Sequence, residues 1–245
     1  MQVHGIIPAR FASTRFPGKP LALIHGKAMI QHVYEQCQKS TALDQVIVAT
    51  DDDRIADFVK GFGGKVQMTA SHHHSGTDRI AEIAESLPEE DIIINIQGDE
   101  PFIDPRLIDQ VAAPLLHQKA QIVSAAKRLK EAEALNNPNV VKVVFGKTQK
   151  ALYFSRHPIP FQRGVEPTQW IKKGDFYQHI GIYGFQASVL KELSKLSVSP
   201  LEQQESLEQL RWLDNGYSIF MQITSFESFG VDTPEDLQRI ENHGQ

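Results

Sequence analysis

The first half of the chain alternates between short apolar runs and stretches with a helical period. Apolar runs at residues 3–7, 46–49 and 92–96 predict buried strands, of the kind covered on both faces in a parallel sheet. Helical periods lie between the runs. The first helical face consists of Met29, Ile30, Val33, Tyr34 and Cys37. Strands that alternate with helices imply right-handed crossovers, so we expect a doubly wound α/β sheet.

Several helix boundaries carry signals of their own. Ser75 and Asp78 have the spacing of a capping box at the start of a helix. Asp104 caps another helix, with Pro105 at its first position. A further helix follows the segment TDDDR and ends at the glycines near residue 63. These signals agree with the periods and fix where the first-half helices begin and end.

From about residue 140 the rhythm changes. The segments VVKVVF, GKTQ and ALYFS predict a β-hairpin, and IGIYGF predicts a further strand. We expect LEQQESLEQLRWL to form one helix, then a strand at 218–223 and a helix capped by Thr233. Antiparallel pairing makes the sheet mixed. We therefore predict a single domain over residues 1–245, with residues from about 120 to 200 forming a smaller inserted lobe.

Composition narrows the class of protein. The chain of 245 residues is 41% hydrophobic and 22% charged, which is ordinary for a soluble globular protein. A formal charge of −5 argues against a broad nucleic-acid surface. Neither a signal peptide nor a run of roughly 20 apolar residues is present, so we expect a cytoplasmic protein with no membrane partner. Cys37 is the only cysteine, and the most economical interpretation is a buried structural thiol.

The opening loop concentrates positive charge. Arg10, Arg15, Lys19 and Lys27 all precede the first carboxylate, at Glu35. The loop leaves the first strand at the carboxyl edge of the sheet, where ligands bind in open α/β folds, and the cations suit a triphosphate. Neither the P-loop pattern nor GxGxxG is present, so the phosphate cradle is a different one and a dinucleotide-dependent enzyme is not supported. The alternative interpretation is a solvated loop with chance cations.

Two acidic segments are candidates for a metal site. Asp99, in INIQGDEPFI, follows a buried strand, and Asp232, in FGVDTPEDL, follows another strand and a glycine. Carboxylates in this position can hold Mg²⁺ together with substrate phosphates. Each could instead be a turn or capping aspartate. The run of histidines at 72–74 reads better as a surface loop, because adjacent residues do not easily converge on one ion.

Six segments together carry a resemblance to a known family. They are IIPARFASTRFPGKPL, HHSGTDRIAE, INIQGDEPFI, YQHIGIYGF, LEQLRWL and GVDTPEDL. In this order, over nearly the whole chain, they resemble the 3-deoxy-manno-octulosonate cytidylyltransferases, or CMP-Kdo synthetases. The opening segment is shared in looser form with CMP-sialic acid synthetases and other sugar nucleotidyltransferases.

The resemblance implies a nucleotide-diphospho-sugar transferase type of Rossmann-like fold, in which the smaller lobe serves dimerisation. It also implies a Mg²⁺-dependent homodimer that joins CTP to Kdo, with release of pyrophosphate, for lipopolysaccharide assembly. The implied catalytic residues are Arg10, Lys19, Asp99 and Asp232, of which the two aspartates are metal ligands. The implied nucleotide-binding residues are Arg10, Ser13, Lys19, Ser75 and Arg79. The implied Kdo-binding residues are Gln97, Arg156, His179, Tyr183, Glu208 and Gln209.

Other interpretations stay open at this point. The same reaction on sialic acid or on an amino analogue of Kdo would share the phosphate machinery. A regulatory nucleotide-binding domain would keep the cradle but would have little use for Asp99, Asp232 and the carboxylate clamp expected of Arg156. Glu208, on a leucine-striped helix, could simply face solvent.

Overall fold

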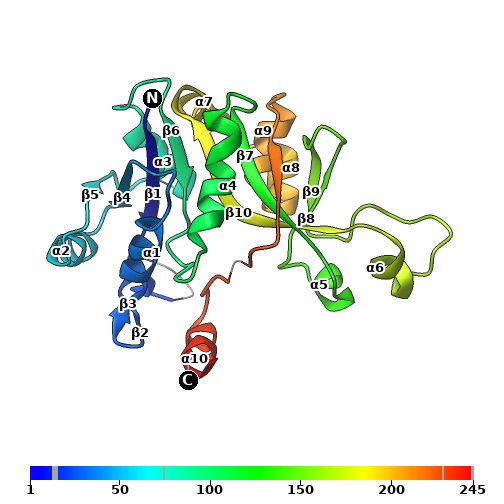
Figure 1. The fold of residues 1–245 in the computed structure, drawn as a ribbon, viewed down its shortest axis with the longest axis horizontal. Coiled ribbons are helices and arrows are strands. Elements are labelled where there is room, and N and C mark those ends of the chain that lie inside the picture. Colours follow the sequence, from blue (N-terminus) through cyan, green and yellow to red (C-terminus); the bar gives the residue numbers. More distant parts are fainter. Residues whose placement is uncertain (13–15, 74, 228, 244–245) are drawn as a thin grey trace.

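The structure is a computed structural model that describes residues 1–12, 16–73, 75–227 and 229–243. Within these residues a nine-stranded sheet forms the centre of the molecule (Figure 1). Seven strands follow the order β11-β7-β10-β6-β1-β4-β5. They are β1 (Val3–Ala9), β4 (Gln45–Thr50), β5 (Val66–Met68), β6 (Ile92–Asn95), β7 (Ile122–Arg128), β10 (Tyr177–Gln186) and β11 (Phe220–Thr224).

The direction of the strands defines the edge at which a site can form. β1 pairs in parallel with β4 and β6, and β11 pairs in parallel with β7. β10 is antiparallel to both β6 and β7, which makes the sheet mixed, as predicted. The carboxyl ends of β1, β4 and β6 therefore lie side by side. β10 extends past that edge, because its Tyr183 is already opposite Asn95 at the end of β6.

Helices cover both faces of the sheet. One face carries α1 (Met29–Cys37), α2 (Asp53–Gly61) and α4 (Pro105–Leu116), and the other carries α3 (Gly76–Ala84), α7 (Ala187–Leu193) and α9 (Gln209–Asp214). Alternate side chains of one strand enter opposite cores: Ile7 packs with α1 and α4, whereas Ile6 packs with α3 and α9. This confirms the doubly wound α/β fold.

The sequence signals for local structure are largely confirmed. Ser75 caps α3 in a full capping box with Asp78, and Asp104 caps α4 through the amide of Arg106 at 2.9 Å. The predicted hairpin forms as β8 (Lys142–Phe145) and β9 (Ala151–Ser155). Cys37 is a buried free thiol. Among the described residues, no helix has the length and apolar character to cross a bilayer.

The prediction of one helix over residues 201–213 is wrong. The chain instead forms α8 (Pro200–Glu205) and α9, separated by Ser206 in the left-handed region with φ of 52°. The break turns Leu207 and Leu210 into the core, whereas α8 buries no side chain. A continuous leucine stripe does not reveal this, because both helices keep a helical period on either side of the break.

The segment that the sequence assigns to a smaller lobe has two parts. β7 and β10 belong to the central sheet, whereas α5 (Ala132–Asn136), η2 (Pro167–Gln169) and α6 (Trp170–Lys173) extend from it beyond the β8–β9 hairpin (Figure 1). This extension has its own small core. The core consists of Leu129, Leu135, Trp170 and Phe176.

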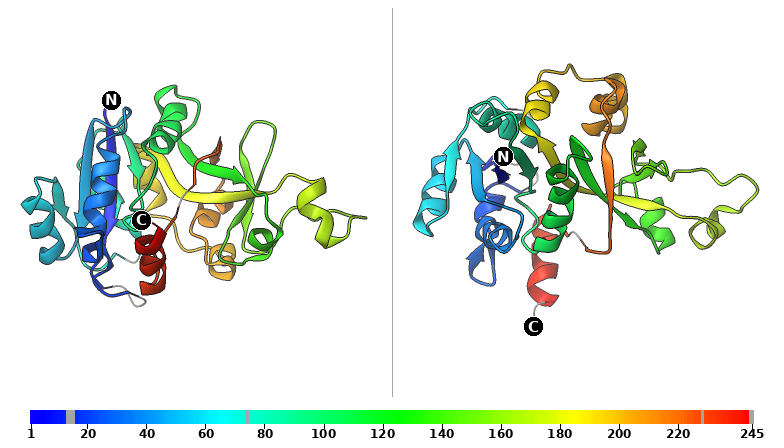
Figure 2. Two further views of the ribbon diagram at one scale, coloured as in Figure 1. Left: turned by 60° about the horizontal axis from the view of Figure 1, so that its bottom comes forward. Right: turned by 45° about the horizontal axis from the view of Figure 1, so that its top comes forward.

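The last helix returns to the start of the chain. α10 (Pro234–His243) packs near the two-stranded ribbon of β2 (Leu23–Ile24) and β3 (Lys27–Ala28), which follows the 3-10 turn η1 (Lys19–Leu21) (Figures 1 and 2). Val231 is fully buried against Ile24 and Met29. The amide of Asp236 donates to the Thr233 hydroxyl at 3.2 Å, as a helix cap does. This return places the segment around residue 232 next to the opening loop.

We expect Ser206→Val to destabilise the fold by about 1–3 kcal/mol, because a β-branched residue is strained at positive φ. Chemical denaturation of the two proteins measures the difference. Ser206→Gly is the matched control and should unfold close to the wild type, since glycine adopts this conformation freely. Equal stability of the valine and glycine variants would contradict the role assigned to this turn.

Candidate active site

The opening loop is closed by a backbone hydrogen bond at its base. The Gly18 amide donates to the Phe11 carbonyl at 2.9 Å, and Gly18 adopts φ of 71°, which favours glycine. The turn delivers Lys19 to the carboxyl edge of the sheet. Ser13, predicted to contact the nucleotide, and its neighbour Arg15 lie outside the described residues.

Lys19 brings the two candidate metal-binding aspartates together. Its Nζ lies 2.6 Å from Asp99 Oδ2 and 3.6 Å from Asp232 Oδ1. The Val231 amide also donates to the Asp99 carbonyl at 2.9 Å, which ties the two acidic segments directly. Asp99 and Asp232 are separated by more than half of the chain in sequence, yet they meet at one ammonium group.

The two carboxylates fit a magnesium ion. Both are hard oxygen ligands, and they already lie around one cationic group. Mg²⁺ usually takes one or two such ligands from a protein, and waters and phosphates complete its coordination shell. Within the described parts of the chain no cluster of three or more His, Cys, Asp or Glu side chains is arranged to hold a metal. The arrangement therefore suits an ion that is bound together with a phosphate substrate.

A pair of arginines lies at the ends of β1 and α3. Arg79 is fully buried, with Nη1 2.5 Å from the Thr69 hydroxyl and Nη2 3.3 Å from Asp51 Oδ1. The pKa of Arg10 is lowered, first by burial and then by the charge of Arg79, while Asp51 and Asp78 oppose that effect. Arg10 Nη2 is buried and has no hydrogen-bond partner among the described residues. A phosphate would satisfy this donor, because anions accept from guanidinium groups.

The first turn of α3 is bonded to the joint between α8 and α9. The hydroxyl groups of Ser75 and Thr77 donate to Glu208 Oε1 at 3.1 Å and to Oε2 at 2.6 Å. Burial raises the pKa of Glu208, and these two hydrogen bonds oppose that rise. Glu208 is thus not a solvated side chain. The structure joins it to Ser75, which the resemblance assigns to the nucleotide.

A polar group lies where β10 passes the carboxyl edge. A bulge between Ile180 and Tyr183 turns this part of β10, and the rings of His179 and Tyr183 lie 5.3 Å apart. His179 Nε2 is 2.9 Å from the Ser124 hydroxyl, and burial lowers the pKa of His179 to about 3. The pKa of Tyr183 is raised by burial and then by the charge of Glu208. At neutral pH this group therefore offers an uncharged imidazole and an uncharged phenol.

Gln97 lies at the same edge, just after β6, whereas Gln209 is the first residue of α9. Gln97 Nε2 donates to the Gly181 carbonyl, in the β10 bulge, at 3.2 Å. Gln209 is buried one helical turn before Trp212, whose ring packs edge-on against Tyr183 at 5.1 Å. Gln209 Nε2 has no hydrogen-bond partner within the described ranges. Gln97 is thus bonded to β10 itself, and Gln209 lies on the helix whose Trp212 packs against Tyr183.

Arg156 is engaged elsewhere. Its guanidinium donates to three backbone carbonyls: those of Glu205 at 2.7 Å, Pro138 at 3.1 Å and Ser206 at 3.3 Å. These bonds tie β9 to the end of α8 instead of directing the side chain toward Tyr183. Arg156 also lines a cavity of about 660 Å³ beside Trp170 in the extension.

Two residues in contact with this site are absent from the sequence-based assignment. Asp51 pairs with Arg79, and Thr77 bonds to Glu208. Asp51 follows β4 at the same edge as Arg10 and Asp99, so the rule that ligands bind at the carboxyl ends of strands could have found it. Thr77 has no comparable signal, because its partner is 131 positions away.

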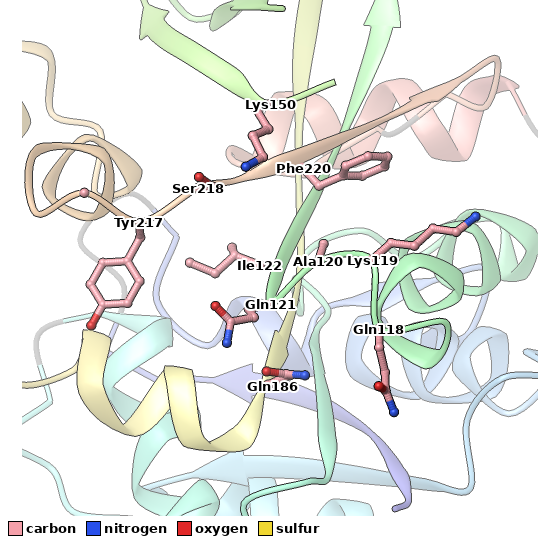
Figure 3. Close-up of a pocket in the computed structure, with 11 residues that line it drawn as sticks. Gln118, Lys119, Ala120, Gln121, Ile122, Lys150, Gln186, Tyr217, Ser218 and Phe220 are labelled. Atoms are coloured by element: carbon pink, nitrogen blue, oxygen red, sulfur yellow. The ribbon is translucent and has the colours of Figure 1, made fainter. Parts of the chain in front are cut away.

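A second cavity lies at the opposite edge of the sheet. It has a volume of about 550 Å³ and is lined by residues at the start of β7 and β11 and at the end of β10. Figure 3 shows Gln121, Gln186 and Tyr217 around it, together with Lys119 and Lys150. Its lining holds no carboxylate and none of the predicted site residues. This cavity therefore has no part in the chemistry expected from the sequence.

The fold is a mixed α/β fold of the nucleotidyltransferase type. Its carboxyl edge brings together the Lys19 cation, two converging carboxylates and an uncharged polar group on β10. A family profile described as Cytidylyltransferase matches residues 4–223. The chain belongs to the cytidylyltransferase family, within the group of 3-deoxy-manno-octulosonate cytidylyltransferases.

Named relatives are similar over their whole length. A 3-deoxy-manno-octulosonate cytidylyltransferase from Phocaeicola vulgatus is 53% identical, with 98% of this chain and 96% of the relative covered. The enzyme of the same name from Thermodesulfovibrio yellowstonii is 50% identical, with 96% and 95% covered. A solved CMP:2-keto-3-deoxy-manno-octonic acid synthetase complexed with CTP is 40% identical, with a TM-score of 0.92 over 99% of this chain and 98% of that one.

We expect Gly98→Ala to lower cytidylyl transfer on the order of a hundredfold, because displacing a catalytic group by about 1 Å can cost that much. A Cβ at Gly98 would lie 2.8 Å from the Pro8 carbonyl oxygen, so the ends of β1 and β6 must separate and move Asp99. Steady-state kinetics measure the loss. Gly146→Ala, where a Cβ meets nothing within 4 Å, is the control. An active Gly98→Ala enzyme would show that this close approach does not set the site.

Proposed function

We propose that this protein transfers the cytidylyl group of CTP to 3-deoxy-D-manno-octulosonate (Kdo), forming CMP-Kdo and pyrophosphate. The observation that carries the proposal is the meeting of Lys19, Asp99 and Asp232 at the carboxyl edge of the sheet, the edge at which Arg10 follows β1. The names of the relatives supply the identity of the two substrates. CMP-Kdo would then serve lipopolysaccharide assembly, and the enzyme would act in the cytoplasm.

The reaction joins two anions, which decides what the protein must provide. A hydroxyl of Kdo attacks the α-phosphorus of CTP in line, loses its proton and displaces pyrophosphate. Such transfers need positioning and positive charge where the transition state gathers negative charge, and no covalent nucleophile. Arg10 and Lys19 extend from the opening loop and supply that charge, while Arg79 stands behind Arg10 at the start of α3.

Asp99 and Asp232 would hold Mg²⁺. When bound there, the ion supplies charge neutralisation at the phosphates and lowers the pKa of the attacking hydroxyl. The chain keeps both carboxylates ready for it, because the Lys19 ammonium neutralises the repulsion between them. The backbone bond from Val231 to Asp99 fixes their spacing without using either side chain.

The polar group around Tyr183 would bind the sugar. The His179 imidazole, uncharged at neutral pH, and the Tyr183 phenol offer hydrogen bonds without adding charge next to an anionic substrate. Gln97, Glu208 and Gln209 add amide and carboxylate groups for the sugar hydroxyls. For Arg156 to clamp the Kdo carboxylate, its guanidinium would have to exchange at least one carbonyl bond at the end of α8.

The extension between β7 and β10 would contribute to a homodimer. It presents Phe161, with 74% of its surface exposed, and β9 in the adjoining hairpin presents Leu152, with 66% exposed. Apolar surface of this kind is covered favourably by a second copy of the chain. Sedimentation at micromolar protein measures the oligomeric state.

A substrate panel tests the proposed function. Pyrophosphate release should be fast with CTP, Kdo and Mg²⁺, and at least a hundredfold slower when sialic acid replaces Kdo, because unpaired buried polar groups reject an ill-fitting sugar. An amino analogue of Kdo and UTP complete the panel. Preference for another sugar acid would reassign the acceptor while keeping the transfer. CTP binding without any pyrophosphate release would favour a regulatory nucleotide-binding protein.

Removal of either metal-binding carboxylate tests the mechanism. Asp99→Asn and Asp232→Asn should each abolish turnover in Mg²⁺ while the fold stays intact by circular dichroism. Near-normal pyrophosphate release would remove that residue from the metal site.

Removal of a cation should have a smaller effect. Arg10→Ala and Lys19→Ala should each lower kcat/KM on the order of one to three decades, as loss of one preorganised transition-state donor does. Lys147→Ala, in the β8–β9 turn, is the matched control. Unchanged values for Arg10→Ala and Lys19→Ala would return the opening loop to a solvated surface segment.

A further inference from the structure

Glu208 lies at the joint between α8 and α9. It also lies between the expected nucleotide region and the expected sugar region. It follows Ser206, the residue that breaks the helix, and precedes the first residue of α9. Its carboxylate points to the first turn of α3, where Ser75 is expected to face the nucleotide. Its own expected ligand is the sugar. The Glu208 carboxylate therefore connects the expected nucleotide region with the expected sugar region of the proposed active site.

Two hydroxyl groups fix that orientation, but they are not equivalent. Ser75 Oγ is also the cap of α3, since it accepts from the Asp78 amide at 3.0 Å. The Thr77 hydroxyl, on a side chain only 5% exposed, makes the shorter bond, 2.6 Å to Glu208 Oε2. A hydrogen bond to a buried carboxylate is worth more than one between neutral groups. Both hydroxyl groups bond to the same carboxylate, and the shorter distance makes Thr77 the stronger of the two constraints.

The other side of the joint is held by an ion pair. The Arg211 guanidinium donates to both carboxylate oxygens of Glu202, at 2.7 and 2.6 Å, and to the Leu196 carbonyl at 3.0 Å. Glu202 also accepts from the Ser199 amide in the capping box of α8. Both side chains of the pair are almost buried. Because the backbone around Glu208 is held in this way, its carboxylate depends mainly on Thr77 and Ser75 for its direction.

Several charges face Glu208 from the elements packed around it. Asp78 on α3 disfavours its ionised form, and Arg211 on α9 favours it. The charge of Glu208 in turn raises the pKa of Tyr183 on β10, after the larger effect of burial. Burial raises the pKa of Glu208, and the Thr77 hydrogen bond is the largest effect that lowers it. Loss of the Thr77 hydroxyl would therefore raise this pKa further.

We propose that Thr77 is a positioning residue for the acceptor sugar: its hydroxyl directs the Glu208 carboxylate so that it can accept from a sugar hydroxyl group. The inference rests on the proposed function, because it takes the sugar as the ligand of Glu208. In this proposal Thr77 acts on the sugar through its hydrogen bond to Glu208. Its effect must appear through Glu208 and in the use of the sugar, with little effect on CTP.

Thr77→Val, which removes the hydroxyl and keeps the shape, is the central variant. The KM for Kdo should rise on the order of tenfold, the size of a lost hydrogen bond to a charged group, while the KM for CTP stays within about twofold of the wild type. The acid limb of kcat/KM for Kdo should move to higher pH, because the ionised Glu208 is then formed at higher pH. Thr77→Ser keeps the hydroxyl and should restore both properties.

A double-mutant cycle separates this role from a structural one. If Thr77 acts through Glu208, adding Thr77→Val to Glu208→Gln should cause no further loss in the use of Kdo. Ser86→Ala, which removes another hydroxyl near the end of the same helix, is the matched control. Thermal unfolding of every variant, with Thr77→Ala as a second hydroxyl-free form, identifies any loss of fold.

Two results would overturn the proposal. One is that folded Thr77→Val or Thr77→Ala has the same KM for Kdo and the same pH profile as the wild type. The other is a loss that is equal for CTP and Kdo, or that adds fully to the effect of Glu208→Gln. The wild-type substrate panel keeps the two questions apart: a different preferred sugar acid corrects the proposed function, and the variants are then assayed with that acid.

Discussion

The ammonium group of Lys19 between Asp99 and Asp232 organises the active edge of the protein. Two carboxylates that approach the same point repel each other, and an ammonium group 2.6 Å from one and 3.6 Å from the other offsets that repulsion. The pair is partly exposed, at 28% for Asp99 and 48% for Asp232, and exposed ion pairs contribute only about 0–1 kcal/mol to stability. The contact therefore matters for arrangement more than for folding. It gathers the opening loop, the end of β6 and the approach to α10 at one point.

The sheet explains why these segments can meet. β1, β4 and β6 run in parallel and end together, so residues just after each strand face the same space. β10 runs the other way and continues past that edge, with a bulge between Ile180 and Tyr183. One antiparallel strand among parallel neighbours thus forms a second side of the space beyond the edge. In an all-parallel sheet only loops would form that side.

The sequence predicts those structural features that depend on residues close together in the chain. Continuous apolar runs gave β1, β4 and β6, and cap spacing gave the start of α3, because these signals act within a few residues. The edge rule then placed Arg10 and Asp99 together. The meeting of Asp232 with Asp99 depends on a backbone bond across more than half of the chain. The residues alone made the two aspartates candidates for one metal site but left a turn or capping role open, and the family resemblance favoured the metal. The break at Ser206 was missed because a leucine stripe reports burial and not a single reversed backbone angle.

The two sides of the site differ in how they manage charge. The side that holds Lys19 and Arg79 keeps its charges, and each of these two cations is paired with an aspartate. The side around Tyr183 is buried, and burial keeps the imidazole and the phenol neutral. Glu208 is the exception there, a carboxylate whose burial disfavours its charge and whose hydroxyl partners restore it. Well-packed apolar residues would stabilise the joint at least as well as this buried polar cluster. Stability of the fold therefore does not explain why two hydroxyl groups hold a carboxylate in this place. A ligand that donates a hydrogen bond to the carboxylate explains it better.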